Sequence, residues 1–175
     1  MKRLFLIGWI LSMAFLEFKC QLKSANGLIS GDKLKTLRYA GTYRFGSYGD
    51  TTKFGPGGQV IIYALNDDSV LFYLDVSRGA PSYNMGSLYN SLKVNSDKCI
   101  FNKKFDYCDN NCKLSFKFKD SLLIISTINN DCGFGGNVIA DGIYKKVNSD
   151  QPTFFEDAHG NKIYFDKTKP DNYFK

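Results

Sequence analysis

Histidine and tryptophan each occur once in the 175 residues, and this shortage narrows the chemistry that is open to the chain. A cysteine protease or transferase needs a thiol paired with a histidine, which a third group orients. The single histidine, His159, lies between Ala and Gly in the turn-like segment DAHGN, where we expect solvent to surround it. The sequence therefore argues against histidine-dependent catalysis, and we assign no catalytic residue.

Long stretches of helical periodicity are lacking as well, and proline is scarce. The aromatic content of 15% consists almost entirely of Tyr and Phe, which favour strands. A hydrophobic content of 43% excludes a disordered chain, and the length suits a single domain. These features predict an all-β protein.

The N-terminus reads as an export signal, residues 1–20. Lys2 and Arg3 precede a continuous apolar run over residues 4–16. The run is shorter than the roughly 20 residues of a membrane span and matches the apolar region of a signal peptide. We predict an exported protein that is periplasmic, attached to the outer membrane or secreted. An uncleaved anchor or a buried helix is the alternative.

Cys20 follows this run at the position where a bacterial lipoprotein carries its acylated cysteine. Phe18 and Lys19 precede it, whereas that signal normally has small residues there. Ordinary cleavage near residues 24–27 is the other possibility, and the sequence leans slightly toward it. Contact with a membrane is expected only through a lipid on Cys20.

Metal ligands and charge clusters are sparse. Cys108 and Cys112 are separated by three residues, but no Cys-x-x-Cys pair exists, and exported cysteines are oxidised by default. We predict neither metal nor cofactor.

The net charge of +6 comes from lysines spread along the chain, so we expect a solvated basic surface and no nucleic-acid partner.

The chain divides into a tether (21–38), a barrel domain (39–147) and a C-terminal extension (148–175) that allows an extra hairpin. The expected strands are listed in chain order: 39–46, 59–65, 69–77, 85–94, a hairpin over 99–108, 112–119, 122–128, 137–147, and short strands at 153–157 and 162–165. Most connections are short, so eight to ten strands form a single antiparallel up-and-down barrel, with a two-sheet sandwich as the alternative.

Two strands have distinctive patterns. In 112–119, Leu114, Phe116 and Phe118 share one face while lysines and serine occupy the other. The apolar run 122–128 has no such alternation, which predicts burial on both faces.

The glycine-rich segments 54–60 and 132–138 run into strands, so they lack the helix start that a phosphate loop needs. Carboxylate pairs occur in predicted turns, at Asp67 with Asp68 and at Glu156 with Asp157. A hydrolase that uses such a pair is retained only as the weakest alternative.

Aromatic side chains are the remaining lead for binding. Tyr63, Tyr73, Tyr83 and Tyr89 fall in or next to strands, where some can line a barrel mouth. Ordinary strand propensity also explains them.

Four cysteines remain after Cys20, which suits disulfides in an exported chain. A two-residue turn at residues 103–104 places Cys99 opposite Cys108, and Cys112 then pairs with Cys132. Pairing of Cys108 with Cys132 stays open.

The segments CKLSFKF (112–118) and CGFGGNVIADGIYKK (132–146) resemble a pattern of small exported bacterial domains, C-x-L-x-F-x-F followed by CGFG-x-x-V-x-A-x-G-x-Y. These domains resemble lipocalin-like barrels and sometimes accompany lysozyme-inhibitor-like proteins. The resemblance implies a β-barrel with a stapling disulfide and implies no catalytic residue. The second cysteine pair departs from the simplest form of the pattern.

Together these observations predict a non-enzymatic binding protein of the bacterial envelope. Its partner is a protein, an envelope component or a small apolar ligand. An inhibitor or immunity protein directed at a cell-wall hydrolase is the alternative.

Overall fold

The computed structural model describes residues 34–50 and 54–173. The expectations for the signal peptide, for Cys20 and for most of the tether lie outside these residues. The described end of the tether is part of the folded unit, because it enters a short 3-10 helix, η1 (Lys35–Tyr39), whose Thr36 and Tyr39 are buried.

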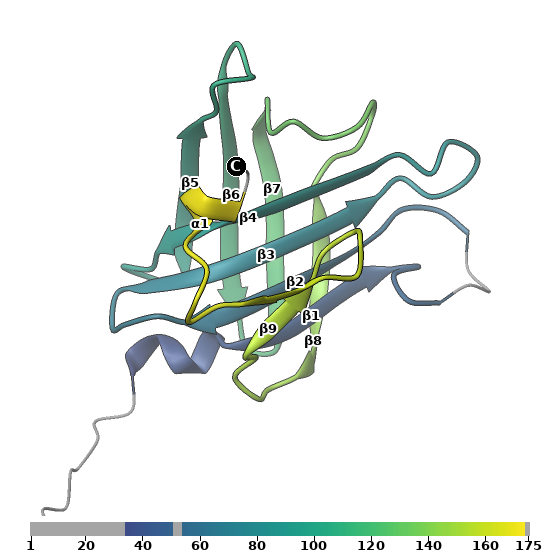
Figure 1. Ribbon diagram of the computed structural model, residues 1–175. Coiled ribbons are helices and arrows are strands. Elements are labelled where there is room, and N and C mark those ends of the chain that lie inside the picture. The colour runs from purple at the N-terminus through teal and green to yellow at the C-terminus, as the bar shows by residue number, and fades with distance from the viewer. Residues whose placement is uncertain (1–33, 51–53, 174–175) are drawn as a thin grey trace, which may run out of the picture. The chain divides into compact units, whose positions relative to one another are not determined.

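An antiparallel sheet of eight strands curls nearly into a barrel (Figure 1). Its strands are β1 (Gly41–Gly46), β2 (Gly57–Ala64), β3 (Ser69–Ser77), β4 (Met85–Lys93), β5 (Lys98–Lys104), β6 (Asn111–Lys119), β7 (Leu122–Asn130) and β8 (Gly142–Asn148). The order β4-β3-β2-β1-β8-β7-β6-β5 leaves β4 and β5 as edges on either side of a seam. In Figure 1, β1–β4 run across the view while β5–β7 stand upright. The prediction of an all-β antiparallel barrel is confirmed.

Period-two alternation fills the interior. In β3, Val70, Phe72, Leu74 and Val76 point inward and are at most 1% exposed. In β6, Leu114, Phe116 and Phe118 are buried as predicted. Each such side chain contributes about 1.5–3 kcal/mol through burial, so this core holds the two halves of the sheet together.

The predicted hairpin over 99–108 is wrong. Residues 98–104 form one strand, β5, which pairs with β6 and places Cys99 opposite Phe116. The chain turns later, within residues 105–110, where Asp106, Asp109 and Asn110 supply turn-forming side chains that Lys103 and Lys104 lack.

Two further strand predictions need correction. β7 is buried on one face only, through Leu123 and Ile125, because no described element covers its outer face. The strand predicted from residue 137 begins at Gly142, since Asn137 has a left-handed backbone (φ 61°) and residues 131–141 form a loop. We call residues 131–141 the glycine corner.

The C-terminal extension packs on the barrel's exterior. β9 (Phe154–Glu156) and β10 (Lys162–Tyr164) form the hairpin predicted for the tail, and α1 (Pro170–Tyr173) follows. Phe155 stacks on Tyr73 with ring centroids 3.9 Å apart, and the Tyr89 hydroxyl donates to the Thr168 carbonyl oxygen at 2.6 Å. The outer face of β2–β4 thus belongs to a second core of Ile61, Leu71, Tyr73, Tyr89, Phe155 and Phe165.

Replacing Phe155 by Ala is expected to lower the free energy of unfolding by about 3–5 kcal/mol, because a fully buried ring leaves a cavity. Its neighbour Phe154 points the other way and is only partly buried, so Phe154→Ala is the matched control and should cost about 1 kcal/mol. Urea unfolding followed by fluorescence measures both. Equal losses would show that the extension does not pack through this face.

Candidate binding site at the loop end

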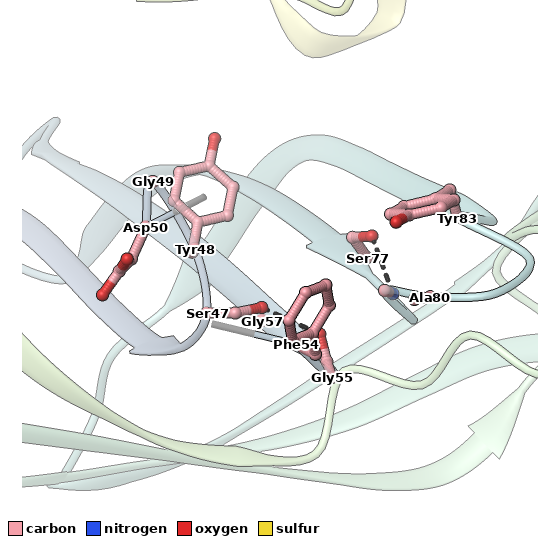
Figure 2. Close-up of a pocket in the computed structure, with 11 residues that line it drawn as sticks. Ser47, Tyr48, Gly49, Asp50, Phe54, Gly55, Gly57, Ser77, Ala80 and Tyr83 are labelled. Atoms are coloured by element: carbon pink, nitrogen blue, oxygen red, sulfur yellow. Dashed lines mark hydrogen bonds between the residues drawn. The ribbon is translucent and has the colours of Figure 1, made fainter. Parts of the chain in front are cut away.

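Two loops at one end of β1–β4 enclose a surface pocket of about 440 Å³ (Figure 2). They are the β1–β2 loop, through its described residues 47–50 and 54–56, and the β3–β4 loop, residues 78–84. Its lining includes the side chains of Ser47, Tyr48, Phe54, Ser77 and Tyr83 and the backbone of Gly79. The volume lies within the range typical of ligand pockets.

Glycine lets the two loops touch. Gly79 has a left-handed backbone (φ 75°), and a Cβ built there would lie 2.1 Å from the carbonyl oxygen of Gly55 in the opposite loop. Any other residue would therefore push the loops apart. Ser47 Oγ donates to the same Gly55 oxygen at 2.8 Å, and Gly79 N donates to Ser77 Oγ at 3.0 Å, so side chains on both sides fix the close approach.

Two exposed aromatic rings line the pocket. Phe54 is 84% exposed and Tyr83 is 64% exposed, and in Figure 2 they lie on either side of Ser77. Tyr83 has φ 51°, and its N–H donates to the Gly79 carbonyl oxygen at 2.8 Å. Large aromatic rings exposed to solvent are typical of binding surfaces.

A polar network anchors Tyr48 of the β1–β2 loop to β3. The Tyr48 hydroxyl donates to Asp75 Oδ2 at 2.8 Å, and Arg44 Nε donates to Gln59 Oε1 at 2.8 Å. Arg44, Gln59 and Asp75 occupy adjacent register positions across β1, β2 and β3. Burial raises the pKa of the Asp75 carboxyl, and the hydrogen bond from Tyr48 only partly opposes this.

The four tyrosines proposed as binding residues have different environments. Tyr73 and Tyr89 are buried under the C-terminal extension, and Tyr63 stacks on Phe165 at 5.3 Å. Only Tyr83 lines the loop-end pocket. Phe54 and Tyr48 were not predicted from the sequence, where their only signal is a position in a glycine-rich segment between two strands.

Asp67 and Asp157, one from each carboxylate pair named from the sequence, accept structural hydrogen bonds, Asp67 from the start of η1 and Asp157 within its own turn. Asp67 Oδ1 accepts a hydrogen bond from Lys35 N at 3.0 Å. The Asn161 side-chain amide donates to Asp157 Oδ2 at 3.0 Å, and the N–H groups of Asn161 and His159 donate to Asp157 Oδ1 at 2.9 Å. These hydrogen bonds, first that from the Asn161 side chain, lower the pKa of the Asp157 carboxyl. The side chain of His159 is exposed.

Over residues 34–50 and 54–173, no three His, Cys, Asp or Glu side chains lie close enough to share a metal ion. In the same part of the chain, no helix has the length and hydrophobicity needed to cross a bilayer.

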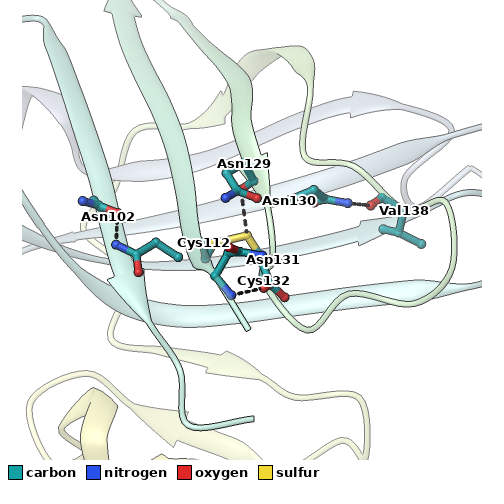
Figure 3. Close-up of a disulfide and its surroundings, with 9 residues drawn as sticks. Asn102, Cys112, Asn129, Asn130, Asp131, Cys132 and Val138 are labelled. Atoms are coloured by element: carbon teal, nitrogen blue, oxygen red, sulfur yellow. Dashed lines mark hydrogen bonds between the residues drawn. A yellow bond between two sulfur atoms is a disulfide. The ribbon is translucent and has the colours of Figure 1, made fainter. Parts of the chain in front are cut away.

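A disulfide joins Cys112 in β6 to Cys132 in the glycine corner (Figure 3). This excludes the alternative bridge between Cys108 and Cys132. The predicted bridge between Cys99 and Cys108 is wrong, because both are free thiols. Cys99 is buried in β5, and Cys108 is half-buried in the turn that follows β5. The error follows from the misplaced hairpin, because a continuous strand separates residues that a turn would bring together.

The glycine corner closes the loop end from the other half of the barrel. Gly135 N donates to the Met85 carbonyl oxygen at 2.9 Å, and Asn84 Nδ2 donates to the Gly136 carbonyl oxygen at 2.7 Å. The Phe134 ring fills the space over Gly86, where a Cβ would lie 2.4 Å from it. The segment is therefore a structural cover that holds the start of β4, with the disulfide securing its base.

No protein-family model, no curated protein and no solved structure matches the chain. The geometry of the loop end is therefore the principal guide to function.

The double variant Cys112→Ala/Cys132→Ala is expected to lose about 3 kcal/mol of unfolding free energy, because the bridge closes a loop with a sequence separation of 20. Urea unfolding without reductant measures this, with Cys108→Ala as the control that should change little. Peptide mapping after alkylation should find Cys112 linked to Cys132 and Cys99 and Cys108 alkylated. A linked Cys99–Cys108 peptide would contradict the structure.

Asp75→Asn is expected to increase the unfolding free energy at pH 7. A carboxyl whose pKa is raised by folding binds its proton more tightly in the folded state, so its ionisation at neutral pH costs stability. The advantage of Asn should disappear at about pH 3, below the pKa of an unfolded Asp.

Asp157→Asn provides the opposite control. Folding lowers the pKa of Asp157, so its carboxylate stabilises above the unfolded pKa and that contribution is lost as pH falls through the folded pKa. This variant should be less stable than wild type at pH 7 and approach it in acid. Urea unfolding at both pH values tests the pair. An Asp75→Asn variant that is less stable at pH 7 would refute the burial argument.

Proposed function

We propose that the chain is an exported, non-enzymatic binding protein of the bacterial envelope, which recognises a protein or another envelope component at its loop end. The observation that carries this proposal is the pocket between the β1–β2 and β3–β4 loops, with the exposed rings of Phe54 and Tyr83 beside it. Its volume suits one side chain or one ring-sized group of a larger partner.

The packed interior argues for the loop end over the barrel's inside. Tyr43, Phe72, Phe116 and Tyr144 fill the interior and are at most 1% exposed. The Tyr43 and Tyr144 hydroxyls donate to the carbonyl oxygens of Tyr39 and Ala140, so these rings are fixed in place. A small apolar ligand inside the barrel would have to displace these rings. The packed interior therefore argues against a carrier of small apolar ligands, one of the partners expected from the sequence.

The pocket's carboxylates do not favour hydrolysis. A glycosidase needs two carboxyl groups that face each other across the substrate. Asp50 is the only carboxylate among the described residues that line the pocket, and in Figure 2 it points away from Phe54 and Tyr83. The carboxylate-dependent hydrolase therefore remains the weakest alternative.

An inhibitor of a cell-wall hydrolase is the second candidate. The β3–β4 loop projects from the barrel in Figure 1 and carries the exposed ring of Tyr83. An ordered projecting loop with an aromatic side chain is suited to entering an enzyme's cleft. The sequence resemblance to domains that accompany lysozyme-inhibitor-like proteins supports the same reading.

Phe54→Ala/Tyr83→Ala tests the loop-end proposal in a pull-down from envelope extract, with the eluate analysed for proteins, lipids and glycans. Loss of two exposed anchor rings is expected to weaken retention of the bound component at least about 10-fold. Tyr164→Ala removes an exposed aromatic ring on β10 and is the matched control, which should retain the component.

If the double variant and the control retain the same components as wild type, the loop end is not the binding site. The inhibitor candidate is separated by assaying muramidases with a micromolar excess of protein. Inhibition that Tyr83→Ala abolishes supports it, and full activity with wild-type protein refutes it.

A further inference from the structure

The outer face of β5–β8 gathers lysines that lie far apart in the sequence. Lys98 projects from β5, Lys113, Lys117 and Lys119 project from β6, and Lys145 projects from β8. Aliphatic side chains lie among them. We call the nine residues Lys98, Ile100, Lys113, Lys117, Lys119, Leu122, Ile124, Ile143 and Lys145 the Lys–Ile face.

Strand register places these residues in rows across the sheet. One row consists of Lys98, Lys117, Ile124 and Ile143, and the next contains Lys119, Leu122 and Lys145. Lys98 therefore lies directly opposite Lys117, an arrangement in which like charges repel. The solvated basic surface expected from the sequence is thus concentrated, in this half of the barrel, on one face of the sheet.

The charges of the face are uncompensated. In the described part of the chain, none of the five ammonium groups has a carboxylate within salt-bridge distance. Among the acidic residues next to the face, Asp97 accepts from Tyr39 and Arg38, and Asp141 accepts from Thr127 N. Asp120 follows Lys119 in the β6–β7 turn and forms no salt bridge with the described lysines of the face. Repulsion without an internal counter-charge favours an anionic partner.

The aliphatic residues distinguish among anionic partners. Ile100 is 46% exposed and Ile143 is 58% exposed, and Ile143 lies opposite the half-exposed Ile124. Apolar side chains among lysines suit the boundary between lipid headgroups and acyl chains. The face has none of the aromatic platforms on which single-stranded nucleic acid stacks, and a symmetric contact with a second copy would bring lysine against lysine.

We propose that the Lys–Ile face docks the barrel on an anionic phospholipid surface. The lysines are attracted to lipid headgroups, at about 1 kcal/mol for each residue near the surface, while Ile100 and Ile143 enter the interface. The loop-end pocket is formed by other segments, so this inference does not depend on the proposed function.

Co-sedimentation with vesicles tests the proposal. The full chain is mixed with vesicles of phosphatidylglycerol and phosphatidylcholine in equal parts, and with vesicles of phosphatidylcholine alone. Residues 1–33 are present in every variant, so any binding through them is the same in all samples. The quantity measured is the difference between binding to the anionic vesicles and binding to the neutral vesicles. Wild-type protein should prefer the anionic vesicles, and this preference should weaken as salt is raised.

Lys117→Gln/Lys145→Gln is expected to reduce binding to the anionic vesicles about 25-fold, from about 5-fold for each charge. Lys162→Gln/Lys167→Gln removes the same charge from the C-terminal extension and should have little effect. Ile143→Ser leaves the charge unchanged and should also weaken binding, which purely electrostatic adsorption does not predict. Phe54→Ala/Tyr83→Ala should bind vesicles like wild type.

Three results would overturn the proposal. The first is equal binding of wild-type protein to both vesicle types. The second is an equal loss in the Lys117/Lys145 and Lys162/Lys167 variants, which would indicate a net-charge effect. The third is tighter binding to duplex DNA than to anionic vesicles in the same buffer.

Discussion

The stack of Phe155 on Tyr73 is the contact on which the packing of the C-terminal extension against the barrel centres. β3 presents Phe72 and Leu74 to the barrel interior and Leu71 and Tyr73 to the exterior, so it is apolar on both faces. Such a strand at the surface would expose a large hydrophobic patch. The C-terminal extension removes that patch from water, and residues 154–173 are therefore part of the fold.

This packing makes the two halves of the barrel unequal. The outer face of β2–β4 is occupied by intramolecular contacts, among them the hydrogen bond from Tyr89 to Thr168. The outer face of β5–β8 has no comparable cover among the described residues, and there the outward positions are lysines and half-exposed aliphatics. Among the described residues nothing packs on this second face, so its charge and apolar content bear on function.

Much of the strand layout was predictable, because alternation along a strand directly reports one buried face. The strand over residues 69–77 and the buried face of 112–119 were predicted correctly on that basis. The hairpin over 99–108 failed because a local turn was assumed where β5 instead pairs with β6. The uncovered side of β7 was misjudged for a related reason: an apolar run does not reveal whether anything packs against it.

The candidate surfaces were harder to predict, since both arise from pairings between distant segments. Tyr83 was named from the sequence, but Phe54 becomes its neighbour only because Gly79 packs against Gly55. Lys98 and Lys117 face each other only through the register of β5 and β6. Residue type indicated what these side chains can bind, whereas their grouping follows from strand order and register.

The disulfide connects the two halves at the loop end. Cys132 fixes the glycine corner to β6, and from there Gly135 and Gly136 reach the start of β4 through hydrogen bonds with Met85 and Asn84. The β3–β4 loop is thus held on one side by Gly55 and on the other by the glycine corner. A loop restrained from both sides loses little conformational entropy when it binds, so the exposed ring of Tyr83 is already positioned for a partner.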